Sequence, residues 1–319
     1  MITTATQRVF ENMAETGSGD AGALAVGLRR EVTSLGLLAL AAKALHVAAA
    51  APERISDIYD NATAGWLSGP VFPPRLRTDD PLPISRGFWK AFWELVNLPP
   101  DVRRTAFSER TLALAGELDP RISPRMAAAA LAYPGVAEAA AKGIPEPYDL
   151  EALGKGSPAS LGYALRQETQ RAGGLVSPFG RSIVPFLRHM PAPLDTINIQ
   201  VVQSMTLWGL VAGYRSSRLD QMGIGGFLMG QVAHHYSALA TAVTLTVAGL
   251  ERGESLELML DSTFKGWTHG RQTPLLLGVQ WDDLWHLPID KVRAELGVTP
   301  FPSPFAAALR QSVEGKSKH

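Results

Sequence analysis

The sequence predicts an all-α fold, built as a single multi-helix domain with an N-terminal helical extension. Apolar residues recur three and four positions apart through most of the chain, which is the period of an amphipathic helix. Alanine, leucine and arginine dominate, and long runs of alternating β-branched residues, the usual signature of strands, are missing. We therefore expect helices joined by turns and proline-rich connectors.

Residues 1–85 are predicted to form the N-terminal extension and a connector. Residues 22–50 are rich in alanine and leucine and indicate one helix. This helix would end before Pro52, because the residue preceding a proline is pushed out of helical geometry. Residues 64–85 are proline-rich and show no helical period, so we expect an extended connector there.

Residues 86–300 are predicted to form the main helical domain. Its first helix, 86–97, carries two phenylalanines and two tryptophans on one face, which core packing explains more simply than a ligand pocket. Further helices are predicted at 101–117, 123–142, 158–172 (capped by Ser157), 196–214, 223–250 and 254–268. A helix over 287–297, with an early proline and a glycine just past its last turn, closes the domain. Residues 301–319 are expected to form a loose tail.

Composition excludes several classes of function. Thirty basic residues balance thirty acidic ones, so the chain lacks the basic surface of a nucleic-acid-binding protein. The absence of cysteine removes disulfides, thiolate nucleophiles and cysteine-bound zinc, and it fits a reducing compartment. No charged N-terminal segment precedes an apolar run, so we expect a cytoplasmic protein without a signal peptide.

Two apolar stretches are candidate membrane spans. Residues 32–42 are too few to cross a bilayer. Residues 221–250 carry no formal charge and are long enough, but they contain glutamines, histidines, a tyrosine and several threonines. Polar groups at this density are costly in hydrocarbon, so we predict a helix buried in a protein core.

The same uncharged stretch holds the candidate catalytic residues, His234, His235 and Tyr236. Adjacent helical residues point about 100° apart, so the two histidines are a weak two-ligand metal motif. Gln231 would share a helix face with one of them. Two interpretations stay open. These residues are either buried polar groups with core partners, or the polar end of an apolar cavity in which a histidine acts as general base and Tyr236 or Tyr214 orients a ring oxygen.

Three segments of the chain resemble the ubiquinone (coenzyme Q) biosynthesis proteins of the fourth yeast coenzyme Q complementation group. The most specific segment is Gly266-Trp267-Thr268-His269-Gly270-Arg271-Gln272-Thr273-Pro274-Leu275-Leu276, followed by Trp281-Asp282-Asp283 and Leu296-Gly297-Val298. The middle segment, Ser160-Leu161-Gly162-Tyr163-Ala164, is similar to the family's Leu-Pro-x-Gly-Ser-Leu-Gly-x-x-Tyr motif, from which it departs in having Pro158-Ala159 where Gly-Ser is usual. The third, residues 205–214, keeps Trp208, Gly213 and Tyr214 in the family's frame. The resemblance covers roughly residues 87–300.

The resemblance implies an all-helical, often dimeric protein at a membrane surface that holds a polyprenyl quinone precursor. Such a protein organises biosynthetic enzymes or decarboxylates the ring oxidatively, and the second activity needs a metal bound by His-Asp-x-x-His and a later glutamate. In this chain the first three ligand positions are Met205, Thr206 and Gly209, and the glutamate position is Gln221 or, with a small shift of register, Ile224. None of these residues supplies an imidazole or a carboxylate. We therefore expect no metal and no other cofactor.

These observations predict a metal-free relative that binds a hydrophobic intermediate, prenylated or polyketide-like and aromatic, in quinone or secondary-metabolite biosynthesis. The ligand-binding candidates are Trp208, Gln221, Gln231, Tyr214 and Arg271. The alternative is a repurposed, metal-independent cyclase, isomerase or hydrolase that uses the inherited cavity with histidine and tyrosine as acid–base groups. Expected partners are the hydrophobic small molecule, other biosynthetic enzymes and a second copy of the chain in a homodimer, with a membrane surface as a further, peripheral contact.

Overall fold

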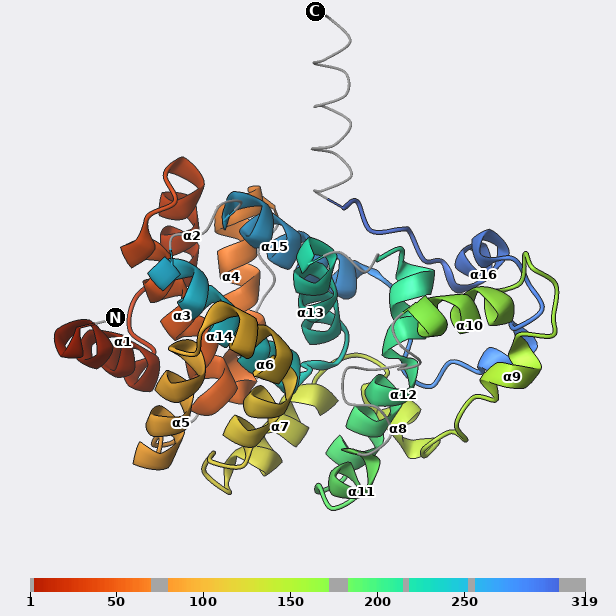
Figure 1. The fold of residues 1–319 in the computed structure, drawn as a ribbon, viewed down its shortest axis with the longest axis horizontal. Coiled ribbons are helices and arrows are strands. Elements are labelled where there is room, and N and C mark those ends of the chain that lie inside the picture. The colour runs from red at the N-terminus through yellow and green to blue at the C-terminus, as the bar shows by residue number, and fades with distance from the viewer. Residues whose placement is uncertain (1–2, 70–79, 172–182, 215–217, 252–255, 304–319) are drawn as a thin grey trace, which may run out of the picture.

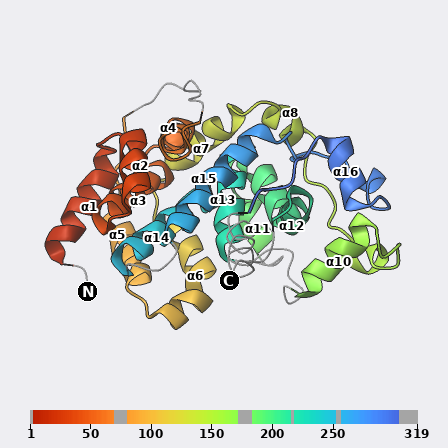
Figure 2. The same ribbon diagram turned by 90° about the horizontal axis from the view of Figure 1, so that it is seen from above.

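A computed structural model describes residues 3–69, 80–171, 183–214, 218–251 and 256–303 (Figure 1). The regular secondary structure of these residues is helical and includes no strand, which confirms the predicted all-α class. The N-terminal helices gather at one end with α14, helices α9, α10, α12 and α16 lie at the other, and α13 and α15 lie between the two groups (Figures 1 and 2).

The N-terminal region contains helices α1 (Thr4–Thr16), α2 (Ala21–Arg30), α3 (Ser34–Ala49) and α4 (Ile55–Leu67). The prediction of one helix over residues 22–50 is wrong, because the chain breaks between α2 and α3. Glu31 adopts an extended conformation, and the Thr33 side chain accepts a hydrogen bond from the amide of Gly36, which starts a new helix. The predicted connector begins after α4, and its residues 70–79 lie outside the described part of the chain.

The middle of the chain forms α5 (Arg86–Val96), α6 (Pro100–Ala115), α7 (Ile122–Leu131), α8 (Val136–Ala141), α9 (Leu150–Leu153), α10 (Leu161–Arg171) and α11 (Val184–Leu187). The predicted helix over 123–142 is divided at Pro134 and Gly135, where Gly135 takes a left-handed φ of 79°. The predicted cap of α10 is also wrong by one turn, because Ser160, and not Ser157, accepts the amide of Tyr163.

The C-terminal part forms α12 (Leu194–Ala212), α13 (Arg218–Val232), α14 (His235–Glu251), α15 (Leu256–Gln272) and α16 (Ile289–Leu296). The helix predicted over 223–250 is broken at Ala233, whose φ of 52° is left-handed. His234 therefore lies between two helices, and His235 begins α14. The final helix agrees with the prediction, since Gly297 closes α16 in a left-handed conformation. Residues 304–319 of the predicted tail lie outside the described part.

Helices α13 and α15 cross with their backbones in direct contact, and glycine makes this possible. A Cβ atom on Gly226 would lie 2.3 Å from the carbonyl oxygen of Thr263, and one on Gly270 would lie 2.3 Å from that of Phe227. Gly266 faces the carbonyl of Gly223 in the same way. These distances are far below van der Waals contact, so this crossing requires the missing side chains.

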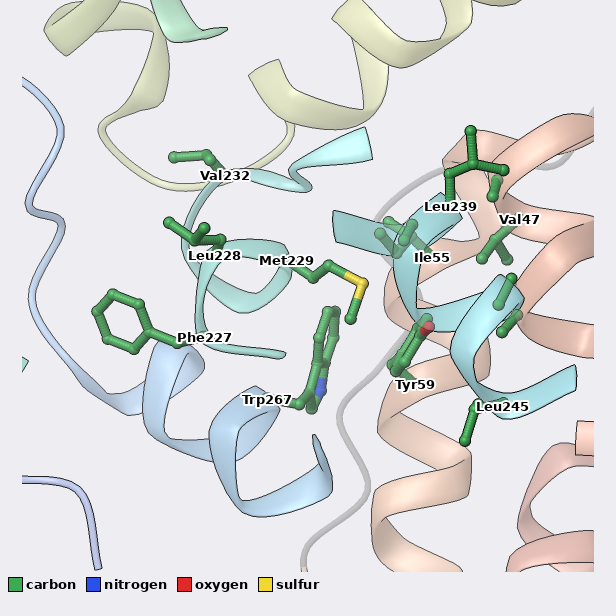
Figure 3. Packing of buried hydrophobic residues seen from close by; sticks show 14 of the residues in the cluster. Val47, Ile55, Tyr59, Phe227, Leu228, Met229, Val232, Leu239, Leu245 and Trp267 are labelled. Atoms are coloured by element: carbon green, nitrogen blue, oxygen red, sulfur yellow. The ribbon is translucent and has the colours of Figure 1, made fainter. Parts of the chain in front are cut away.

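The core joins the N-terminal helices to the rest of the molecule. Tyr59 of α4 stacks on Trp267 of α15 with ring centroids 5.1 Å apart, and Met229 of α13 lies beside them (Figure 3). Phe10 of α1 stacks at 5.7 Å on Phe92, one of the aromatic residues of α5. The aromatic face of α5 is thus core packing, as predicted, and Phe92 is fully buried.

The uncharged stretch 221–250 is distributed over α13 and α14, and α14 packs along α3. Most of the side chains of α14 are buried. Among the described residues, no helix combines the length and the apolar character that crossing a bilayer requires.

Candidate functional site

Tyr214, which follows α12, and His269, in the last turns of α15, form a hydrogen-bonded pair. The Nε2 atom of His269 lies 2.7 Å from the carbonyl oxygen of Thr299, which can only accept, so Nε2 carries the proton. The Nδ1 atom is then the acceptor, and the Tyr214 hydroxyl donates to it at 2.8 Å. The pair joins two of the three segments that carry the family resemblance.

Local backbone geometry aims Tyr214 at this position. Gly213 ends α12 with a φ of 85°, and the amide of Tyr214 donates back to the carbonyl of Gly209 at 2.8 Å. The chain therefore turns sharply and directs the ring toward α13 and α15. On the other side, the glycine contacts between α13 and α15 bring His269 within reach.

Two phenylalanines wall the pair. The ring of Phe301 stacks on Tyr214 with centroids 4.3 Å apart, and Phe227 meets Tyr214 edge-on at 5.5 Å. The same rings lie 5.7 Å and 5.2 Å from the imidazole of His269. The hydroxyl–imidazole bond thus sits in an aromatic environment, in which flat rings pack favourably.

The segment 299–303, here called the strap, crosses over this site. The amide of Phe301 donates to the carbonyl of Ala212 at 2.8 Å, and the hydroxyl of Ser303 donates to the carboxylate of Asp220 at 2.6 Å. Asp220 is only 1% exposed. Together with the imidazole bond described above, these contacts fasten the strap to α12, α13 and α15.

The electrostatics of the site agree with the direction of the hydrogen bond. Burial lowers the pKa of His269, so the imidazole is neutral at neutral pH and its Nδ1 can accept. Burial and the nearby charge of Asp220 raise the pKa of Tyr214, so its hydroxyl stays protonated and can donate.

The positions that would bind a metal in the resembling family hold no suitable ligands. A Cβ atom on Gly209 would lie 3.0 Å from the Cδ1 atom of Ile224, so an isoleucine side chain lies against the third ligand position. Gln221 is exposed at the start of α13, so the shifted register, with Ile224 as the glutamate position, matches the packing better. The donor set does not fit a divalent metal. Among the described residues there is no group of three or more histidine or acidic side chains able to hold one.

The structure places the two histidines of the uncharged stretch against different partners. His234 is 5% exposed, and its Nδ1 lies 2.7 Å from the hydroxyl of Ser237. His235 is 8% exposed and donates from Nε2 to the carbonyl of Ala48 in α3. Burial lowers the pKa of His234 to about 3 and that of His235 to about 4, so both are neutral at neutral pH.

Tyr236 lies 6.3 Å from the His234 ring, measured between centroids. Burial raises the pKa of its hydroxyl to about 12, while hydrogen bonds to Ser108 and Thr111 of α6 oppose the rise. Each of the three residues therefore has a partner inside the protein. An acid–base role for them stays a prediction.

Gln231 connects α13 to the segment that follows α15. Its amide nitrogen donates to the carbonyls of Gly270 and Thr273, both at 2.9 Å, and its amide oxygen accepts from Leu276 at 2.9 Å. These bonds use both the donor and the acceptor end of the side chain. A ligand could reach Gln231 only by replacing main-chain partners.

Arg271 is held in a buried ion pair. Its guanidinium donates to Asp60 of α4 at 2.8 Å and lies 5.6 Å from the ring of Trp267. Trp208, another predicted ligand-binding residue, is 1% exposed within the core. The hydrogen bonds of Tyr214 and His269 run to each other and to Thr299, whereas the ion pair of Arg271 runs to Asp60.

A small void lies elsewhere in the described core, enclosed by α3, α4, α14 and α15. Its volume is about 10 Å³, which is room for about one water molecule. Its walls are almost entirely apolar and are formed by Leu40, Ala44, Ile58, Tyr59, Ala62, Leu245, Leu260, Thr263 and Phe264. An aromatic ring does not fit this space, so it is not a ligand site in this conformation.

Sequence reasoning selected Tyr214 but missed His269, Asp220 and Asp60. A signal for His269 existed, because it lies in the most specific of the resembling segments, two residues before Arg271. Its partner lies 55 residues earlier in the chain, on another helix end, and no local spacing reveals that pairing.

Comparison with solved structures finds a similar fold in a crystal structure described as a "Putative ubiquinone biosynthesis protein" from Nostoc punctiforme PCC 73102. The two structures superpose with a TM-score of 0.51 at 16% sequence identity, over 66% of this chain and 97% of that chain. No protein-family model matches the sequence, and no curated protein matches it. The likeness supports a ubiquinone-biosynthesis-like fold.

Proposed function

We propose that this protein is a metal-independent member of the ubiquinone biosynthesis family introduced above, and that it binds a hydrophobic aromatic intermediate of quinone or secondary-metabolite biosynthesis. The observation that carries the proposal is the Tyr214–His269 pair between the rings of Phe227 and Phe301. The pair combines a polar hydroxyl with flat apolar walls, which is the combination that a phenolic ring needs.

The ligand ring would take the place of Phe301, whose stacking on Tyr214 at 4.3 Å shows how a ring packs there. The ring would then lie against Tyr214 and Phe227, with its polar substituent at the tyrosine hydroxyl. Because Phe301 lies in the strap, binding would move Phe301 out of this place, while Thr299 at the start of the strap keeps its bond to His269.

Metal independence is supported by the packing of Gly209 against Ile224. An aliphatic side chain at this position offers no lone pair and excludes water, so it cannot take the part of a metal-binding carboxylate. Homodimer formation, contact with other biosynthetic enzymes and peripheral contact with a membrane belong to the proposal as well.

Native mass spectrometry of the protein purified without chelator tests the proposal first. We expect a retained lipophilic aromatic molecule and no metal, and denaturing analysis of the released compound would name its class. A stoichiometric bound metal would overturn metal independence.

A binding titration of wild type and two phenylalanine variants tests the ligand site directly. We expect a 4-hydroxybenzoate ester with a decyl tail to bind the protein, and Phe301→Ala to strengthen binding about tenfold, because the ligand ring no longer has to displace the Phe301 ring from Tyr214. Phe186→Ala should have no effect, since Phe186 is 56% exposed on α11. A bare protein in native mass spectrometry that also fails to bind this probe would refute the ligand-binding function.

A further inference from the structure

We infer that Tyr214 and His269 form a proton relay that receives the proton of a ligand hydroxyl group, and that the ligand is therefore a phenol or an enol and not a quinone or an ether. The inference rests on the proposed function for the place of the ligand. It adds the chemical class of the group that is recognised.

The direction of the hydrogen bonds carries the argument. The bond from Nε2 to the Thr299 carbonyl fixes the tautomer of His269 and leaves Nδ1 as an acceptor. The single proton of the Tyr214 hydroxyl is then committed to Nδ1 at 2.8 Å. The Tyr214 oxygen can offer only its lone pairs to a ligand, so a ligand group that meets it has to donate. A hydroxyl group donates, whereas a quinone carbonyl and an ether oxygen cannot.

The relay step balances without any further reagent. The ligand O–H bond breaks as its proton passes to the Tyr214 oxygen, while the tyrosine proton passes to Nδ1 of His269. The products are a ligand phenolate or enolate and an imidazolium. No electrons are transferred between groups. Nε2 keeps its proton and its bond to Thr299, so the ring stays in place throughout.

The surroundings assign different parts to the two residues. The negative charge of Asp220, on α13, opposes ionisation of Tyr214. Tyr214 therefore gains the ligand proton as it gives up its own and does not become a tyrosinate. Tyr214 touches the ligand hydroxyl and is the catalytic residue of the relay. His269 acts through Tyr214 and is a positioning residue that also stores the proton.

The test uses 4-nitrophenol, whose ionised form absorbs visible light, and its methyl ether, 4-nitroanisole. Neither probe has a lipid tail. We expect the wild-type protein to bind 4-nitrophenol about tenfold more tightly than 4-nitroanisole, because only the phenol can donate to Tyr214. Tyr214→Phe should abolish this preference.

The pH profile of bound 4-nitrophenol separates a relay from a merely structural bond. The pKa of bound 4-nitrophenol should be about one unit lower in wild type than in His269→Asn. Asparagine can accept the hydrogen bond of the Tyr214 hydroxyl, but it cannot take up the proton. His189→Asn is the control, since His189 is exposed on the surface and bonds the Pro185 carbonyl of its own segment.

Several results would overturn the relay. These are equal affinity for phenol and ether, no binding of 4-nitrophenol, and identical ionisation in wild type and His269→Asn. Nitrogen NMR of His269 that shows the proton on Nδ1 would also overturn it, and this measurement needs no variant. If 4-nitrophenol behaves as expected but the decyl-tailed probe does not bind, the proposed lipophilic ligand fails and the relay stands.

Discussion

Asp60 and Arg271, 211 residues apart in the sequence, form an ion pair inside the core. The guanidinium lies 2.8 Å from one carboxylate oxygen of Asp60, and the indole N–H of Trp267 donates to the other at 2.7 Å. The side chain of Arg271 is 4% exposed and that of Asp60 is 1% exposed. The pair fastens α4 of the N-terminal region to the segment of α15 that most resembles the ubiquinone biosynthesis family.

Removing one charge of this pair should be strongly destabilising. Asp60→Asn leaves the Arg271 charge buried without its counterion, which typically costs about 3–5 kcal/mol. Urea unfolding of the variant measures the loss. Asp290→Asn is the control, because its carboxylate is 92% exposed and an exposed ion pair contributes about 0–1 kcal/mol. Equal losses in the two variants would show that the buried pair does not hold the helices together.

The N-terminal helices should be essential for folding of the rest. Without residues 1–85, the chain loses Asp60 and the ring of Tyr59, and it exposes Trp267 and Leu245 to water. We expect a chain that begins at residue 86 to lack fixed tertiary structure, which near-ultraviolet circular dichroism would show. Cooperative unfolding of that shorter chain would instead support an independent domain.

The α13–α15 crossing should not tolerate a methyl group. In Gly270→Ala the added Cβ would meet the Phe227 carbonyl at 2.3 Å, so the helices must separate, at a cost of about 1–3 kcal/mol or more. Gly27→Ala is the matched control, because nothing lies within 4 Å of its Cβ position in α2. There, alanine should stabilise the helix by about 0.5–1 kcal/mol. Thermal unfolding of both variants gives the comparison, and a neutral Gly270→Ala would contradict the close crossing.

The sequence was informative where the signal is local. The apolar period gave the helical class, and proline and glycine gave the ends of α16, because these residues constrain the backbone wherever they occur. It failed where one or two residues interrupt a good pattern. Ala233 has high helix propensity, yet tertiary packing places it at a left-handed φ of 52°.

The site shows the same limit. Tyr214 could be selected from its segment, but its function depends on His269 and on the strap that carries Phe301, which three separate elements bring together. Such contacts depend on long-range packing, which a helical period does not encode. Asp60 was missed for the same reason, since an aspartate in a helix is exposed far more often than buried.

Three buried histidines should make the free energy of unfolding fall with decreasing pH, already at pH values above those at which carboxylates titrate. Burial lowers the pKa of His46 and His235 to about 4 and that of His234 to about 3. The unfolded chain, with an ordinary histidine pKa near 6.5, then binds more protons than the folded chain below that pH. Stability is therefore complete above about pH 6.5 and falls toward pH 5, by roughly 1 kcal/mol per pH unit for each histidine near pH 5.

Urea unfolding at a series of pH values between 5 and 7 measures this slope. His46→Asn should reduce the part of the slope that these three histidines contribute by about a third, because asparagine can still donate to the Ala14 carbonyl but does not titrate. Replacing the exposed His189 by asparagine should leave the slope as in wild type. Stability that is flat over this range would mean that the three histidines are not buried in neutral form.

Gly209 and Ile224 should be energetically coupled. Alanine in place of a helical glycine normally stabilises a helix by about 0.5–1 kcal/mol, but here its Cβ would lie 3.0 Å from Cδ1 of Ile224. Ile224→Val removes that carbon. Gly209→Ala should therefore be more favourable, by about 0.5–1 kcal/mol, in the valine background than in wild type, as a double-mutant cycle of urea unfolding would show. Additive effects would mean that Gly209 and Ile224 do not interact. The family's glutamate position would then correspond to Gln221, whose exposure would leave room for a ligand that the Ile224 side chain excludes.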